Sequence, residues 1–180
     1  GQTRIAGVKT KTAIQSKVLV NGLKRPWGMT VLPDGRLLIT EKAGVMKIVT
    51  TSGTVSEPIT GLPEVNSAGQ GGLLGLTIDP DFTKNRMVYW SFSEKSASGN
   101  LTAIGKGTLS SDEKRIENVT VIYRANPAHP STGHYGGRIL VDKTGNLLIT
   151  TGERSSLETR PQAQFLTSAN GKVIRINKDG

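Results

Sequence analysis

Two residues of this sequence have types and a spacing that could support proton transfer. His134 is one of two histidines, and Glu153 follows it after an apolar run, a turn at residues 143–145 and a second apolar run. Two antiparallel strands joined by that turn would bring Glu153 back to the end of the sheet where His134 lies. A carboxylate beside an imidazole fixes its tautomer and increases its basicity, so the pair is a candidate general base. A lone loop histidine is more often structural, and spacing alone leaves that alternative open.

The elements that must position this pair are short β-strands. Runs rich in Val, Leu and Ile recur between Gly, Pro, Asn and Asp residues, and no long segment has the 3.6-residue apolar period of a helix. Strands are expected at residues 18–20, 37–40, 45–49, 87–90, 119–123, 147–150 and 172–176. One helical turn is expected around residues 162–166. The predicted class is all-β, with one domain over residues 1–180.

The strands belong to a repeated unit. Residues 32–40 resemble residues 143–150, since both contain a glycine turn followed by Leu-Leu-Ile-Thr, and residues 76–82 form a third copy. The copies are roughly 45 to 62 residues apart, close to the length of a β-propeller blade. We therefore expect about three blades of four antiparallel strands each. Their innermost strands are expected at residues 27–31, 72–76 and 136–140.

The repeat also predicts what lies outside the blades. Its unequal spacing places loops at residues 93–112 and 153–170, and residues 16–20 are expected to join the outer edge of a closing blade. Propellers usually close with four to eight blades. We therefore expect the sequence to be the N-terminal half of a longer β-propeller protein.

A third polar candidate, Gln70, lies in the glycine-rich segment 68–76. This segment lacks the Lys-Ser/Thr ending of a phosphate-binding loop, and no helical pattern follows it. Its glycines are typical of strands that approach one another closely. At the start of an inner strand, Gln70 is expected to point into the mouth of the central channel.

Composition excludes several classes of function. The sequence has no cysteine, which excludes disulfides and thiolate chemistry. The net charge is +9, but the basic residues are scattered and aromatic residues make up only 4%. This pattern does not favour nucleic-acid binding. No apolar stretch is long enough to span a membrane.

The order of several motifs makes a family resemblance specific. The motifs are residues 25–29, 32–35, 69–76, 79–82, 134–138, 151–154, 160–164 and 171–175. On these segments, in this order from about residue 17 to the C-terminal end, the sequence resembles the soluble PQQ-dependent sugar dehydrogenases, the glucose/sorbosone dehydrogenase family, and in particular its aldose sugar dehydrogenase branch.

The resemblance implies a six-bladed propeller that oxidises the C1 hydroxyl of aldoses, using pyrroloquinoline quinone (PQQ) with calcium. It implies that His134 is the general base, that Glu153 supports it, and that Gln70 lines the sugar and quinone pocket. The main ligands of the quinone and of calcium are expected on later blades, so no metal ligand is assigned here and the isolated chain is expected to be inactive. An external electron acceptor and a bacterial periplasmic or secreted location are also expected.

Other residues have structural interpretations. Asp79 begins a turn that the family uses between strands, so a structural role is favoured over calcium binding. Trp27 and Trp90 are expected to pack within blades, and His129 to be an exposed loop residue. The loop containing Arg154 departs from the better-known glucose dehydrogenases, so no cofactor contact is assigned to it.

Two alternative functions remain open. The first is a non-catalytic binding or interaction propeller on the same scaffold, against which the presence of His134, Glu153 and Gln70 argues. The second is a propeller hydrolase such as a lactonase, which would need inward Asn, Asp and Glu residues around a channel calcium ion. The expected inner strands instead contain Gly, Met, Leu and Ile.

Overall fold

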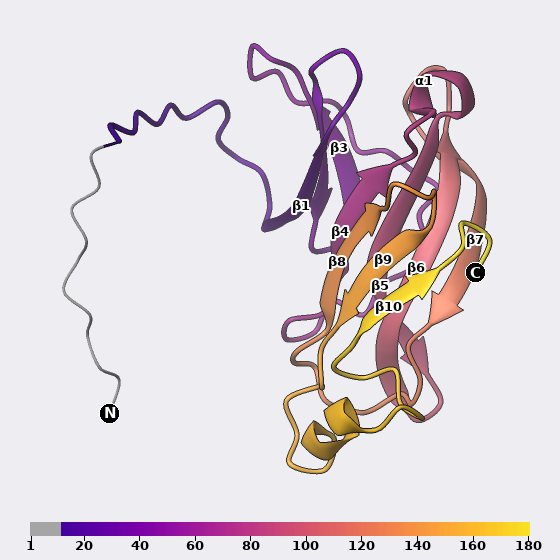
Figure 1. Ribbon diagram of the computed structural model, residues 1–180. Helices are drawn as coiled ribbons and strands as arrows, with labels where there is room; N and C mark the ends of the chain where they lie inside the picture. Colours follow the sequence, from indigo (N-terminus) through magenta and orange to yellow (C-terminus); the bar gives the residue numbers. More distant parts are fainter. Residues whose placement is uncertain (1–11) are drawn as a thin grey trace.

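The computed structural model describes residues 12–180, which form three antiparallel β-sheets (Figure 1). The sheets have the strand orders β1-β2-β3, β4-β5-β6-β7 and β10-β9-β8. The strands are β1 Pro26–Val31, β2 Leu37–Glu41, β3 Val45–Val49, β4 Leu73–Ile78, β5 Met87–Ser96, β6 Gly99–Leu109, β7 Ile116–Arg124, β8 Gly136–Val141, β9 Leu147–Thr151 and β10 Val173–Ile176. The all-β class is confirmed. Two short helices, α1 Phe82–Asn85 and the 3-10 helix η1 Arg160–Gln164, interrupt the strand pattern.

The inner strands β1, β4 and β8 contact one another through their backbones. A Cβ atom on Gly75 would lie 2.2 Å from the carbonyl oxygen of Gly137, and one on Gly28 would lie 2.6 Å from that of Leu74. The Ser91 hydroxyl donates to the same Gly137 oxygen at 2.6 Å. Only glycine permits this approach. The three expected inner strands, and the interpretation of their glycines, are therefore confirmed.

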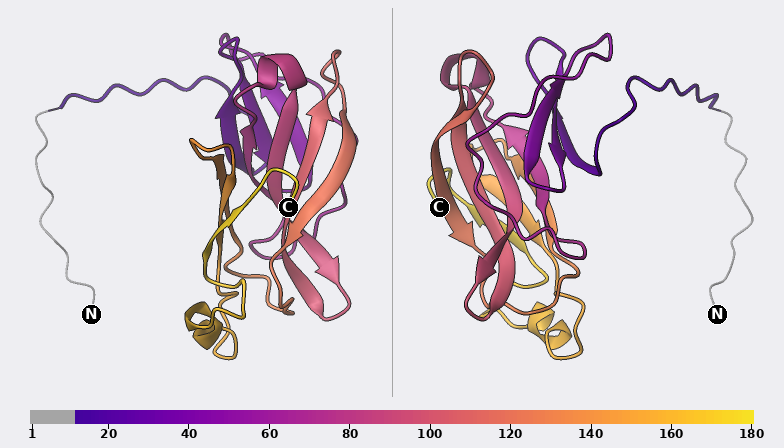
Figure 2. Two further views of the ribbon diagram at one scale, coloured as in Figure 1. Left: turned by 45° about the vertical axis from the view of Figure 1, so that its right-hand side comes forward. Right: turned by 180° about the vertical axis from the view of Figure 1, so that it is seen from behind.

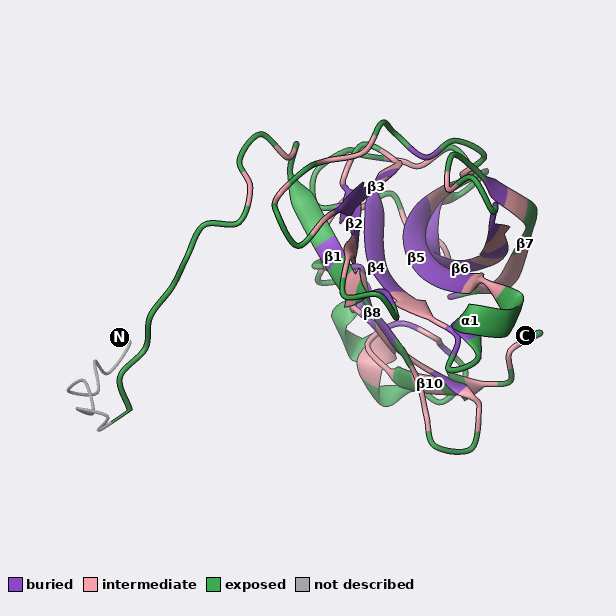
Figure 3. Cartoon of the chain, turned by 90° about the horizontal axis from the view of Figure 1, so that it is seen from above, coloured by how far each residue is buried: buried purple, intermediate pink, exposed green. Residues whose placement is uncertain are grey.

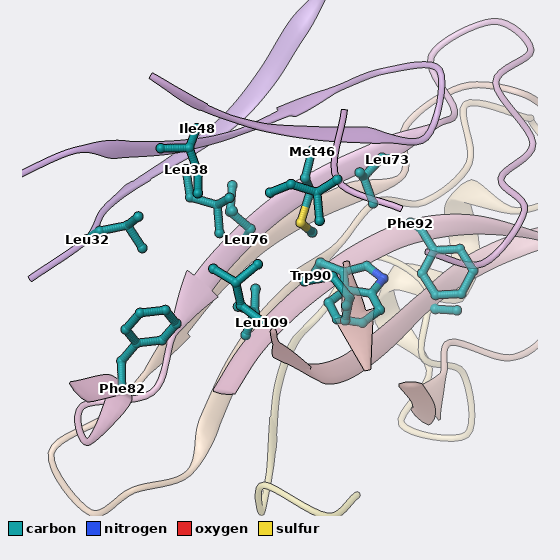
Figure 4. Close-up of a cluster of buried hydrophobic side chains, with 14 of the residues drawn as sticks. Leu32, Leu38, Met46, Ile48, Leu73, Leu76, Phe82, Trp90, Phe92 and Leu109 are labelled. Atoms are coloured by element: carbon teal, nitrogen blue, oxygen red, sulfur yellow. The ribbon is translucent and has the colours of Figure 1, made fainter. Parts of the chain in front are cut away.

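An apolar core lies between the first and second sheets (Figure 4). Trp90 is fully buried at its centre, and a Cβ atom on Gly105 would lie 2.6 Å from the indole ring. A second cluster joins Tyr89 and Ile104 to residues of β8 and β9. Seen from above, buried residues concentrate in β4, β5 and β6, so the middle sheet carries most of the packing (Figure 3).

Asp79 has the structural role that the sequence favoured. Its buried carboxylate pairs with the Lys178 ammonium at 2.7 Å and accepts a hydrogen bond from the Tyr89 hydroxyl at 3.1 Å. Burial acts to raise the pKa of Asp79, but the Lys178 contact and neighbouring donors hold it below its usual value. Asp79 thereby ties the second sheet to the turn after β10.

Three expectations about the strands are wrong. Residues 93–112 form most of the β5–β6 hairpin rather than a loop. Their polar side chains suit a strand because their hydroxyls bond neighbouring backbone, as when Thr102 donates to the Tyr135 carbonyl at 2.8 Å. Residues 16–20 form no strand, since no strand of the described chain pairs with them. The first and third sheets have three strands instead of four.

The long segment between β9 and β10 is irregular, as expected, and contains η1. It lies at the end of the molecule opposite α1 (Figure 2). The helical turn expected at residues 162–166 is present two residues earlier, at Arg160–Gln164. Within residues 12–180, no helix is long and apolar enough to cross a membrane.

Candidate functional site

A pocket of about 500 Å³ lies where β1, β4 and β8 begin. Its size falls within the range of small-molecule sites. The pocket contains both His134 and Gln70, which precede different inner strands and are brought together by the alignment of those strands. The lining residues are Trp27, Lys42, Gly69, Gln70, Leu74, His134, Tyr135 and Gly136.

His134 and Glu153 form the pair that their spacing predicted. The Nδ1 atom of His134 lies 2.6 Å from Oε1 of Glu153. The histidine side chain is 45% exposed and the glutamate side chain 25%. Burial acts to raise the pKa of Glu153, but the hydrogen bond with His134 and backbone donors hold it below its usual value. An ionised Glu153 keeps the proton on Nδ1, and the lone pair on Nε2 is then available to the pocket.

The backbone holds this pair in an unusual conformation. His134 has a φ of 46°, in the left-handed region that few residues other than glycine adopt. Its carbonyl accepts the Arg154 N–H at 3.3 Å, and the Tyr135 carbonyl accepts the Gly152 N–H at 3.1 Å. Such strain clusters at functional sites, where the surrounding structure enforces it. Residues 152–154 therefore wrap around the peptide that carries the histidine.

Gln70 contacts the His134 segment directly. Its side-chain Oε1 atom accepts the backbone N–H of His134 at 2.9 Å, and the backbone N–H of Gln70 donates to the Thr132 carbonyl at 2.8 Å. The carboxamide NH₂ group has no partner within residues 12–180, so it is available to a ligand. Gln70 thus lines the pocket and also positions the histidine, a contact that the sequence did not predict.

Two further lining residues were missed or misinterpreted. Trp27 is 46% exposed and borders the pocket, whereas Trp90 packs in the core as expected. The alternation in β1 explains this, since buried Gly28 places Trp27 on the other face. Lys42 was not singled out, although it borders both this pocket and an adjoining one of about 260 Å³ near Lys24 and Arg25. Lys42 thus brings one positive charge to the pocket, and Lys24 and Arg25 lie in the adjoining one.

Two residues of the neighbouring segments, His129 and Arg154, have buried or largely buried side chains. The side chain of His129 is only 17% exposed, and its Nδ1 atom accepts the Ser131 N–H, so the expectation of an exposed loop residue is wrong. Arg154, to which no cofactor contact was assigned, is buried and does not line the pocket. The burial of these two side chains could not be predicted from the sequence. Both depend on how the residues between β7 and β8 pack against other parts of the chain.

The pKa of Glu153 predicts how the stability of the site depends on pH. Because this pKa is lower in the folded chain than the ordinary value of about 4.3, the carboxylate stabilises the fold above that pH. The contribution is lost as the pH falls through the lower, folded value. We expect Glu153→Gln to lower the urea midpoint at pH 6, and we expect this difference to shrink as the pH falls below the ordinary carboxyl pKa. Exposed Glu158 in the same loop provides the control: a Glu158→Gln variant that changed as much would contradict a specific role for Glu153.

Comparisons with known proteins agree with this architecture. Residues 23–180 match the model of the Glucose / Sorbosone dehydrogenase family. The chain is 35% identical over 169 residues to the Aldose sugar dehydrogenase YliI of Escherichia coli, covering 93% of this chain and 45% of that protein. The PQQ-bound form of Aldose Sugar Dehydrogenase from Streptomyces coelicolor superposes with a TM-score of 0.79 at 29% identity, covering 91% of this chain and 48% of that one.

A relative of another kind also matches. The human Hedgehog-interacting protein is 28% identical over 177 residues, which cover 89% of this chain and 25% of that protein. The chain spans about half the length of the dehydrogenases that it resembles. The family model covers nearly all of the described residues. The chain therefore belongs to the glucose/sorbosone dehydrogenase family.

Proposed function

We propose that these residues form the base-bearing half of a PQQ-dependent dehydrogenase that oxidises the C1 hydroxyl of aldose sugars. The observation that supports this most is the His134–Glu153 pair, whose imidazole borders a pocket shared with Gln70. Family membership supports the same reaction, because relatives are named as aldose sugar and glucose dehydrogenases.

The pocket suits a planar, anionic quinone. The exposed ring of Trp27 offers an aromatic surface, and the Lys42 ammonium, which donates to the Ser67 carbonyl, offers positive charge. The free NH₂ group of Gln70 can donate to a carbonyl or carboxylate oxygen. Trp27, Lys42 and Gln70 would hold one side of PQQ. The remaining contacts, and the calcium ligands, belong in our proposal to blades beyond residue 180.

The chain supplies the acid–base part of the oxidation. Bound PQQ supplies a two-electron acceptor for the hydride that leaves C1 of the sugar. Nε2 of His134 takes the proton of the C1 hydroxyl as the carbonyl of the lactone forms. The Glu153 carboxylate then stabilises the imidazolium and keeps its ring in place. An external acceptor must reoxidise the cofactor, and we propose a bacterial periplasmic or secreted location.

The direct test is an activity assay on two proteins. We expect the intact protein, loaded with PQQ and calcium, to oxidise aldoses in the presence of a redox dye, and to lose that activity when PQQ is withheld. We expect the isolated chain of residues 1–180 to show no turnover above background under the same conditions, because it holds only part of the site. Turnover by the isolated chain would contradict the proposal that residues 1–180 hold only part of the site. A PQQ-loaded intact protein that oxidises no aldose would contradict the proposed function.

A titration of the intact protein with PQQ distinguishes the dehydrogenase from the alternative, a non-catalytic binding propeller. The likeness to the human Hedgehog-interacting protein favours that alternative. An intact protein that binds no PQQ, measured by its absorbance change, would support the binding function. Saturable PQQ binding would support the dehydrogenase.

A further inference from the structure

We propose that Arg154 is a positioning residue that locks the segment bearing His134, so that the imidazole meets the sugar in one orientation. The proposal rests on the proposed function, in which His134 is the base. Arg154 itself does not border the pocket, so it would act through the histidine and not on the substrate.

The guanidinium of Arg154 binds the segment before His134 at several points. Nε donates to the Gly133 carbonyl at 3.1 Å and Nη2 donates to the Ser131 carbonyl. Nη1 donates to the Asn100 carbonyl at 2.9 Å, and Nη2 also reaches the side-chain oxygen of Asn100. One planar group thus fastens the segment to the end of the β5–β6 hairpin.

The same guanidinium also packs against the residue that follows His134. Its central carbon lies 4.0 Å from the centroid of the Tyr135 ring, whose hydroxyl donates to the Asn100 side chain. The backbone N–H of Arg154 donates to the His134 carbonyl. His134 therefore lies between two residues that Arg154 holds directly, Gly133 and Tyr135.

The burial of this arginine requires an explanation. Its side chain is only 1% exposed, and within residues 12–180 no carboxylate pairs with it. Burying a charge without a counter-ion is costly unless hydrogen bonds compensate for it. Arg154 also adopts a left-handed backbone conformation, with a φ of 70°. A buried charge and a strained backbone in one residue indicate that Arg154 is needed to hold the neighbouring His134 segment in place.

Amide hydrogen exchange tests the proposal without cofactor or sugar. The Gln70 and His134 amides report on the locked segment, because they donate to the Thr132 carbonyl and the Gln70 side chain. We expect Arg154→Met, which keeps an apolar contact with Tyr135 but no donors, to speed exchange at both amides about 10-fold or more. The Ile149 amide in β9 should keep its protection. Equal acceleration at Ile149 would show a general structural role and overturn the proposal.

A second variant guards against failure to fold. Arg154→Lys keeps the charge but lacks the planar fork, so we expect intermediate exchange at the two amides. If Arg154→Met does not fold, the lysine variant decides the matter, and unchanged exchange at Gln70 and His134 overturns the proposal. Arg160→Met is the matched control, because Arg160 is an exposed arginine of the same loop.

Kinetics of the intact protein complete the test. We expect Arg154→Met to lower kcat about 10- to 100-fold with little change in KM for the sugar, since a base displaced by about 1 Å loses rate more than binding. An unchanged kcat would overturn the proposal. If the protein oxidises no sugar at all, the proposed function fails, while the exchange result still decides whether Arg154 locks the segment.

Discussion

We expect His134→Ala in the intact protein to lower kcat for aldose oxidation by about 10²- to 10⁴-fold, the usual contribution of a positioned general base. The imidazole borders the pocket, and its Nδ1 atom is held by Glu153 at 2.6 Å. Removing it leaves the C1 hydroxyl without a proton acceptor. The measurement is steady-state turnover with saturating PQQ, calcium and sugar.

Binding should be affected much less than rate. The backbone N–H of residue 134, which donates to Gln70, is retained in the alanine variant, so we expect PQQ affinity to remain within a few-fold of the original value. The matched control is His129→Ala, because His129 lies in the same segment but does not line the pocket. Equal losses in both variants would indicate a folding defect, and full turnover by His134→Ala would remove it from the mechanism.

The inner strands could be predicted from the sequence because their crowded positions admit only glycine, and the glycines recur in each copy of the repeat. A Cβ atom on Gly28 or Gly75 would meet the backbone of the neighbouring inner strand, and one on Gly137 would meet the side chains of Ser91 and Leu74, so each inner strand has a position that excludes larger residues. The β5–β6 hairpin could not be predicted in the same way. Its serines and threonines look like loop residues, and only the neighbouring sheets provide the backbone groups that their hydroxyls bind.

In the candidate site, contacts within one hairpin could be predicted from the sequence, whereas contacts between sheets could not. The hairpin between His134 and Glu153 is local, so its length fixed their proximity. The contact between Gln70 and His134 joins two sheets and could not be derived from local spacing. The burial of Arg154 likewise depends on Asn100, which lies on a distant strand. The exposure of Trp27 could have been inferred, since exposed Trp27 and Met29 flank buried Gly28 and so lie on the open face of β1.

Gly152→Ala should damage the site almost as severely as loss of the histidine. An added Cβ atom would lie 1.9 Å from the His134 carbonyl oxygen and 2.4 Å from its carbon, so the backbone has to move. That movement displaces Glu153 and breaks the hydrogen bonds that residues 152–154 make with the histidine peptide. We expect kcat to fall about 100-fold and the free energy of unfolding to fall by about 1–3 kcal/mol. Turnover and urea denaturation measure the two effects.

Gly145→Ala separates the effect on the site from an ordinary loss of stability. Gly145 lies in the turn of the same β8–β9 hairpin with a φ of 84°, but the nearest atom to an added Cβ is Lys178 Cε at 3.9 Å. Alanine there is strained by about 1–2 kcal/mol without touching the site. We therefore expect Gly145→Ala to lower stability comparably while kcat stays near the original value. Because the two variants would differ mainly in contact with His134, equal turnover in both would show that residues 152–154 do not position the base.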